Sequence, residues 1–193
     1  MNAQISSKPA ASPRSGSMLD PFDIIGSSLA VQQAWLRQPE RLAASLQGLA
    51  LDGHRVHERF AQTGLGIPSD PAVTPVLRDE RFQDSAWSEQ PGFAYLKEMY
   101  LLYSRWLENA IYATEGIEPP RRQRAAFWIR QWLDAIAPSN FFWTNPEALR
   151  RGIASHGHSV LWGLQNWLRD AAAGEVRMVE PDAFKVGRDL AAT

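Results

Sequence analysis

The sequence predicts an all-α fold of about five helices within one small helical domain. A chain of 193 residues that is 45% hydrophobic and 21% charged can build an ordinary core, which excludes a wholly disordered chain. Helix-start signals containing proline recur along the sequence, and the segments after them carry apolar residues at three- and four-residue spacing. The period-two alternation that is typical of strands is almost absent.

The first predicted helix spans residues 20–37. Asp20 can cap free backbone amides, and Pro21 has a backbone geometry that suits the first helical position. The helix is expected to end before Gln38, because a residue that precedes a proline is disfavoured in the helical region. Residues 1–18 are rich in Ser, Ala and Pro, offer little to bury, and are expected to form a disordered tail.

Three further helices are expected at residues 39–62, 91–113 and 119–137. Each begins at a proline and carries an apolar stripe at helical spacing. The 91–113 segment is apolar over about half of its circumference, which favours a central helix contacted by several neighbours. Residues 63–75 contain three prolines and two glycines and are therefore predicted to be a loop.

A fifth helix is predicted at residues 146–173. Asn145 and Pro146 are typical cap and first-position residues, and Gly174 is expected to end the helix in a left-handed conformation. His156 falls inside the apolar stripe of this helix, where a partly buried core histidine is the expected role.

These elements divide the chain into three parts. Residues 1–18 are the tail, residues 19–173 are one helical module, and residues 174–193 are a connector. Val176 and Met178 in the connector belong to a short alternating stretch that is typical of an edge strand. No internal repeat is present.

The first predicted helix has two apolar sides. One side holds Phe22, Ile25, Leu29 and Leu36, and the other holds Ile24, Val31 and Trp35. The first stripe is longer and is expected to pack inward, which leaves the second stripe free. We therefore assign Ile24, Val31 and Trp35 as candidate interaction residues. This helix contains two Asp and no Lys or Arg up to residue 36, so a neutral apolar surface or a protein partner suits it better than an anionic membrane. A helix sandwiched within its own domain is the alternative.

The chemistry-bearing residues do not assemble a recognisable active site. The chain has no cysteine, which excludes disulfides, thiolate metal sites and a cysteine nucleophile within it. His54 and His57 can share a helical face, but two imidazoles without a third ligand make a poor metal site. No P-loop, dinucleotide fingerprint or nucleophile elbow is present. We assign no catalytic residue, no metal ligand and no cofactor.

Charge and hydropathy exclude two classes of partner. A net charge of −1 provides no field to hold nucleic acid. No apolar run is long enough for a transmembrane segment, so a cytoplasmic protein is expected.

Three sequence blocks resemble the N-terminal region of polyhydroxyalkanoate synthases. The first runs over residues 75–111 and contains the family pattern D-x-R-F at Asp79, Arg81 and Phe82, followed by A-W and by an aromatic Y-L-L-x-x-R-W-L helix. The second, at residues 137–153, is similar to S-P-S-N-F-x-x-T-N-P-E, with Ala137 in place of the usual Ser. The third, at residues 180–193, resembles D-P-x-x-F-x-V-G-x-N-L-A-x-T, with Asp in place of the common Asn at position 189.

The resemblance implies a non-catalytic N-terminal module of a polyhydroxyalkanoate synthase. Family members continue into an α/β-hydrolase-like domain in which a G-x-C-x-G box, an Asp and a His polymerise hydroxyacyl-coenzyme A thioesters. None of these catalytic residues can be carried over to a chain without cysteine. By resemblance, the module supports dimerisation, activity and attachment to the storage granule. Its implied partners are the catalytic synthase domain or subunit, the polyester granule surface and a second copy.

Two alternatives remain open. One is a stand-alone granule-associated or synthase accessory protein without catalytic activity. The other is a small-molecule-binding helical domain, for which the content of eight Trp is the only support.

Overall fold

The computed structural model describes residue 20, residues 22–71 and residues 79–174, and every regular element within these residues is helical. The all-α fold class is therefore confirmed. The α-helices are α1 (Ile24–Leu36), α2 (Pro39–Gly64), α3 (Ala86–Glu89), α4 (Pro91–Tyr112), α5 (Pro119–Ala135), α6 (Pro146–Ala154) and α7 (His158–Ala173). Two short 3₁₀ helices are η1 (Glu80–Phe82) and η2 (Pro138–Asn140). The predicted tail and the alternating stretch of the connector lie outside the described residues.

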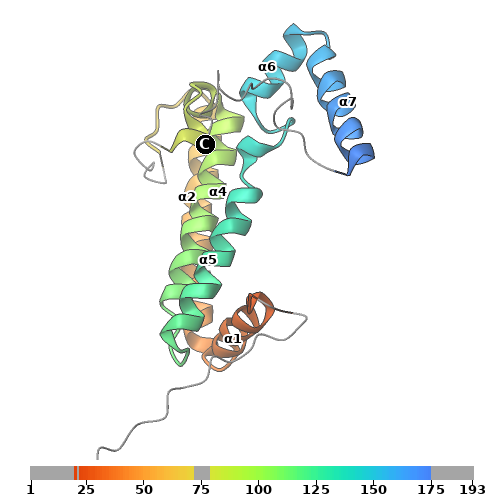
Figure 1. Ribbon diagram of the computed structural model, residues 1–193. Coiled ribbons are helices and arrows are strands. Elements are labelled where there is room, and N and C mark those ends of the chain that lie inside the picture. The colour runs from red at the N-terminus through yellow and green to blue at the C-terminus, as the bar shows by residue number, and fades with distance from the viewer. Residues whose placement is uncertain (1–19, 21, 72–78, 175–193) are drawn as a thin grey trace, which may run out of the picture. The chain divides into compact units, whose positions relative to one another are not determined.

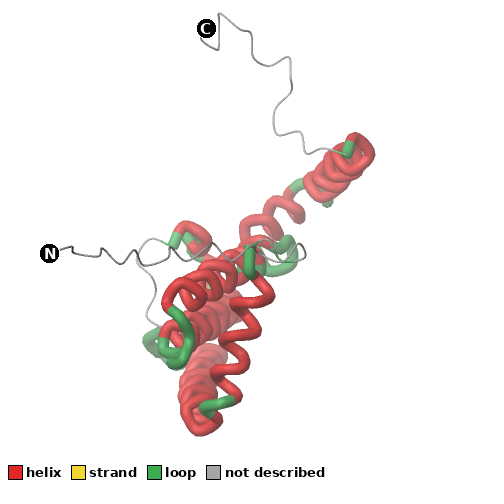
Figure 2. Tube along the Cα trace, turned by 60° about the horizontal axis from the view of Figure 1, so that its bottom comes forward, coloured by secondary structure: helices red, strands yellow, loops and turns green. Residues whose placement is uncertain are grey.

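The chain forms two compact units, residues 1–141 and residues 142–193. In the first unit α2, α4 and α5 run side by side, and α1 crosses one end of them (Figure 1). α4 is the central helix and packs against α2, α3 and α5, as its wide apolar face predicts. Figure 2 shows that short loops join α1 to α2 and α4 to α5.

The first unit has two apolar clusters. The larger one joins α1, α4 and α5 around Val31, Ile111, Ala126 and Leu133, which are at most 4% exposed. The smaller one joins α2 and α4 around Val56 and Leu101. A third packed site lies at α3, where the Trp87 side chain is 1% exposed and its ring meets the rings of Phe82 and Phe93 at 4.9 and 5.6 Å.

Asp20, Asn145 and Gly174 act near helix ends as their residue types predict, but the first helix begins at Ile24 and not at the predicted residues 20–21. Asp20 accepts hydrogen bonds from the backbone amides of Ile24 and Gly26, at 2.7 and 2.9 Å, so α1 begins three residues after Pro21. Asn145 caps α6 by accepting from the amides of Glu147 and Ala148. Gly174 ends α7 with φ of +69°, the predicted left-handed conformation.

The predicted single helix over residues 146–173 is wrong, because it is broken into α6 and α7. His156 and Gly157 have φ of +50° and +83°, and the amide of Gly157 donates back to the carbonyl of Gly152 at 2.8 Å. This closes α6 in the manner of a left-handed helix terminus. The Ser155 hydroxyl accepts from the amide of Ser159 at 3.2 Å and so caps the start of α7. His156 therefore lies in a turn and not on a core stripe.

Candidate functional site

The inward side of α1 is the stripe that was expected to face outward. Val31 is 4% exposed and belongs to the larger core, Trp35 packs partly buried against that core, and Ile24 at the start of the helix is 36% exposed. In the other stripe Ile25, Leu29 and Leu36 are 59%, 48% and 75% exposed. Phe22, just before the helix, is 64% exposed. The predicted orientation is therefore wrong.

Small residues explain this orientation. Ser27, Val31 and Ala34 lie at successive helical turns and are all buried, so they allow α1 to pack against α5. A comparison of large apolar side chains alone overlooks this small-residue face. The role of Ile24, Val31 and Trp35 in binding stays a prediction.

Polar contacts anchor α1 at both ends. At its start, the Asp23 carboxylate pairs with Arg124 Nη1 at 3.0 Å and with Arg121 Nε at 3.8 Å, both from α5. At its end, the indole N–H of Trp35 donates to the Thr114 hydroxyl at 2.8 Å. The helix is thus held across α4 and α5 by contacts near both termini.

An apolar hollow of about 320 Å³ lies between α1, α4 and α5. Its lining includes the candidate residues Ile24, Val31 and Trp35 together with the α5 side chains Trp128, Ile129 and Trp132. Two polar side chains of α1, Ser28 and Gln32, also line it, and no charged residue does. The structure therefore brings the three candidate residues together at a concave surface rather than on an outward face.

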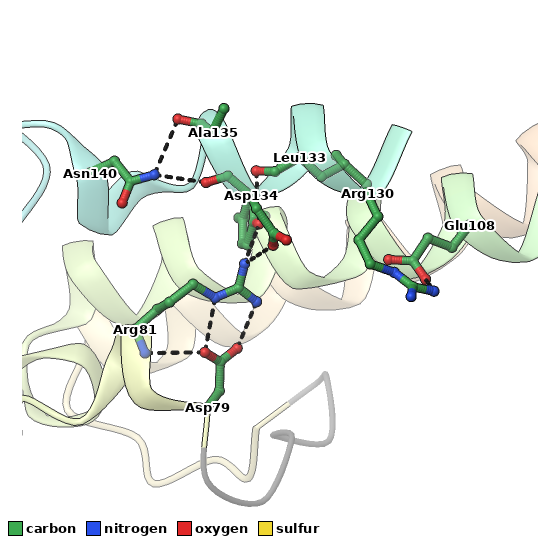
Figure 3. A network of polar contacts seen from close by, with 9 residues as sticks. Asp79, Arg81, Glu108, Arg130, Leu133, Asp134, Ala135 and Asn140 are labelled. Atoms are coloured by element: carbon green, nitrogen blue, oxygen red, sulfur yellow. Dashed lines mark hydrogen bonds and ion pairs between the residues drawn. The ribbon is translucent and has the colours of Figure 1, made fainter. Parts of the chain in front are cut away.

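A polar network around Arg81 joins the segment before α3 to α4 and α5 (Figure 3). The guanidinium donates from Nε and Nη2 to the two carboxylate oxygens of Asp79, each at 2.9 Å. Its Nη1 donates to the Tyr100 hydroxyl at 2.9 Å and to Asp134 at 2.6 Å. Tyr100 in turn donates to the carbonyl of Leu133 at 3.0 Å.

The electrostatics of this network suit a structural role. We call it the Arg81 clasp, and it comprises Asp79, Arg81, Tyr100 and Asp134. The hydrogen bonds that Arg81 donates to Asp79 hold the pKa of the Asp79 carboxyl below its usual range. The same hydrogen bonds raise the pKa of the Arg81 guanidinium. Burial raises the pKa of the Tyr100 hydroxyl, which stays neutral and able to donate. Asn140 extends the clasp by donating to the carbonyls of Asp134 and Ala135 at the end of α5. These residues hold one another and present no activated nucleophile or base.

A buried ion pair joins α2 to α4. The Arg59 guanidinium donates to the Glu98 carboxylate, and their side chains are 15% and 4% exposed. Sequence reasoning did not identify this pair, because a charged residue on an apolar helix face gives no sign of its partner 39 positions away.

The histidines have structural contacts. His57 Nδ1 is 2.7 Å from the carbonyl of Gly53, so it donates, and Nε2 accepts from the Tyr95 hydroxyl at 2.9 Å. His54 lies 3.3 Å from Glu58. Among the described residues, no group of three or more His, Cys, Asp or Glu is placed to hold a metal ion. No described helix is long and apolar enough to span a membrane.

Comparison with known proteins agrees with the three sequence blocks. Residues 78–193 match the family model of the poly-beta-hydroxybutyrate polymerase (PhaC) N-terminus. The chain is 36% identical over 170 residues to the poly(3-hydroxyalkanoate) polymerase of Methylorubrum extorquens, a match that covers 84% of this chain and 28% of the relative. It is 30% identical over 188 residues to the polymerase subunit PhaC of Rhizobium etli, covering 91% of this chain and 29% of the relative.

A third relative is the polymerase subunit PhaC of Cupriavidus necator, which is 39% identical over 121 residues. That match covers 63% of this chain and 20% of the relative. No solved structure matches the chain. The chain thus spans less than a third of the length of these curated relatives. The family match begins at the segment that carries the Arg81 clasp, and we conclude that the chain belongs to the poly-beta-hydroxybutyrate polymerase N-terminus family.

Proposed function

We propose that the chain is the non-catalytic N-terminal module of a polyhydroxyalkanoate synthase, and that it supports dimerisation, activity and granule attachment. One observation carries this proposal: relatives named as polymerases align with most of this chain but with less than a third of their own length. The absence of cysteine from the chain agrees with chemistry that is performed elsewhere in such a polymerase.

The outward stripe of α1 is the surface that we assign to the granule or to a second copy. Ile25, Leu29 and Leu36 are exposed on one side of a helix whose other side is held against α5. Three such side chains can contribute about 1.5–3 kcal/mol each when they are fully buried. The stripe lies on a helix without Lys or Arg, which suits a neutral polyester surface or an apolar protein face.

The α6–α7 hairpin is the surface that we assign to the remainder of the polymerase. Leu161, Leu164, Trp167 and Leu168 are each more than half exposed on one side of α7. A helix with an uncovered apolar stripe is normally buried in the assembled protein. Contacts at this stripe would explain support of activity by a module that contains no catalytic residue.

A domain replacement tests the proposal. The matched segment of a curated relative is either deleted or replaced by this chain, and coenzyme A release from 3-hydroxybutyryl-coenzyme A is measured with a thiol reagent. We expect replacement to restore at least ten times the rate of the deletion, together with granule co-sedimentation. Equal rates for the deleted and replaced enzymes would contradict the proposal.

The isolated chain provides the matching control. It is expected to release no coenzyme A above the rate of the uncatalysed reaction, because it has no thiol to form an acyl-enzyme. Turnover that survives repurification of the chain would contradict its assignment as non-catalytic.

A further inference from the structure

We infer that the hollow between α1, α4 and α5 binds the alkyl chain of a neutral 3-hydroxyacyl ester, such as the end of a short polyester chain. The inference rests on the proposed function for the identity of the ligand. The location of the site and the chemistry of its lining come from the structure. The family comparison assigns no ligand site to this hollow.

The lining selects against a charged ligand. None of the side chains that line the hollow is charged, and the charged residues next in sequence to its lining are paired, Asp23 with Arg124 and Arg130 with Glu108, each at 3.0 Å. An anion inside the hollow would lose its hydration without gaining a partner. The phosphates of coenzyme A therefore do not belong here, whereas an ester without net charge does.

The apolar lining fits an alkyl chain. Val31, Ile111 and Ala125 line the hollow and are 4–5% exposed, and the α5 side chains Trp128 and Trp132 line it as well. At about 30 Å³ for each water-sized group, a volume of about 320 Å³ accommodates about ten such groups. That size suits an acyl ester of medium chain length and lies at the lower end of small-molecule sites, which span about 300–1,000 Å³.

The polar side chains of α1 fit the oxygens of such an ester. The Ser28 hydroxyl donates to the carbonyl of Ile24 at 2.8 Å, which leaves its oxygen able to accept from a 3-hydroxyl group. The side-chain amide of Gln32, one helical turn further along, can donate to an ester carbonyl. A purely hydrocarbon ligand would use neither group.

The site is also preformed. Asp23 and Trp35 hold the two ends of α1 against its neighbours, so the hollow exists before any ligand arrives. Binding therefore requires little loss of conformational entropy in α1, and this favours binding of a small molecule that makes few contacts.

Binding of three small probes to the purified 193-residue chain tests the inference. The probes are methyl 3-hydroxyoctanoate, the free 3-hydroxyoctanoate anion and methyl 3-hydroxybutyrate, and binding is measured by titration calorimetry and by shifts of the Ile111 and Ile129 methyl resonances. We expect the long ester to bind at least tenfold more tightly than the anion of the same chain. It should also bind at least tenfold more tightly than the short ester.

Two pairs of variants locate the site. Ser28→Phe fills the hollow, whereas Leu29→Phe enlarges the next side chain on the outward face, so we expect at least a tenfold loss of affinity in the first variant alone. Trp132→Ala removes a lining side chain, whereas Phe127→Ala removes an aromatic ring of similar exposure on the same helix that does not line the hollow. If Ser28→Phe lowers the stability of the chain, the affinities of Trp132→Ala and Phe127→Ala show whether the ester binds in the hollow.

The outcomes separate the two proposals. Equal binding of ester and anion, unchanged binding in both Ser28→Phe and Trp132→Ala, or no binding of the long ester would overturn the inference. In the last case the hollow is left for a protein partner to cover. Specific ester binding combined with failure of the domain replacement would overturn the proposed function and retain the ligand site.

Discussion

The two units of the chain differ in what their aromatic side chains contact. In the first unit Trp87 is 1% exposed, and Trp106 packs against the larger core and donates from its indole N–H to the Ser45 hydroxyl at 2.9 Å. In the second unit Trp162 and Trp167 are 68% and 64% exposed, and α7 contains no buried residue. Trp87 and Trp106 therefore stabilise the first unit, whereas Trp162 and Trp167 lie exposed on α7.

This difference distinguishes side chains that stabilise the fold from apolar side chains that are exposed and available for interaction. The first unit fills its own core and pairs its charges internally, as the Arg81 clasp and the Arg59–Glu98 pair show. Within its described residues, the second unit holds the helices α6 and α7, whose mutual contact covers only part of their apolar surface. A hairpin of this size normally depends on further packing for independent stability.

The largest expected effect separates a buried from an exposed tryptophan. Trp87→Ala removes a large side chain from a tight aromatic cluster and should lower the free energy of unfolding by about 3–5 kcal/mol. Trp167→Ala removes the same number of atoms from an exposed face and should change it by less than about 0.5 kcal/mol. Urea unfolding followed by circular dichroism measures both. Similar losses in the two variants would mean that the units do not differ in this way.

A second contrast compares two ion pairs on α4. Glu98→Gln leaves the Arg59 guanidinium buried without a full counter-charge and should cost about 3 kcal/mol. Glu108→Gln breaks the pair with Arg130, whose side chain is 50% exposed, and should cost less than about 1 kcal/mol. Both losses are measured by urea unfolding at pH 7. A larger loss in Glu108→Gln would contradict the importance of burial at Glu98.

The Arg81 clasp predicts a pH dependence. The pKa of Asp79 is lowered in the folded chain, so the clasp contributes its full stability above the ordinary carboxyl pKa of about 3.9. That stability is lost as the pH falls through the lowered pKa of the folded state. Asp79→Asn should therefore be less stable than the original chain at pH 7 and should lose less of its remaining stability on acidification to pH 3.

The control for this experiment is Glu147→Gln in α6, outside the clasp, which should preserve the full acid dependence contributed by Asp79. Urea midpoints at the two pH values measure each variant. An acid dependence in Asp79→Asn equal to that of the original chain would contradict the assignment of Asp79 as its source.

Local sequence signals predicted where the helices begin more accurately than they predicted which residues the helices contact. Proline and capping residues located the starts of α2, α4, α5 and α6, because these signals act within a few positions of the chain. The turn between α6 and α7 was missed because isolated glycines, such as the three within residues 146–173, are compatible with a continuous helix in an apolar periodic segment. Its left-handed geometry at His156 and Gly157 becomes visible only in the structure.

Sites that join distant positions could not be predicted from spacing. Arg81 meets Asp134 across 53 positions, and Trp35 meets Thr114 across 79 positions. The motif that contains Arg81 indicated the family without indicating what the guanidinium contacts. The candidate residues Ile24, Val31 and Trp35 were correctly grouped on one side of α1, but the small residues that turn this side inward carried too little hydrophobic signal.

The smallest expected effects test whether the second unit opens independently of the first. Gly157 has φ of +83°, so Gly157→Ala forces an unfavourable backbone conformation and should weaken the α6–α7 hairpin by about 1 kcal/mol. Gly163 lies within α7 with open space where a Cβ would stand, so Gly163→Ala should strengthen the helix by about 0.5–1 kcal/mol. Hydrogen exchange of the α7 amides should therefore accelerate in the first variant and slow in the second, by about fivefold for each 1 kcal/mol. The amides of α4 should exchange at unchanged rates in both, because the first unit has its own core. Parallel changes in α4 and α7 would show that the two units unfold together.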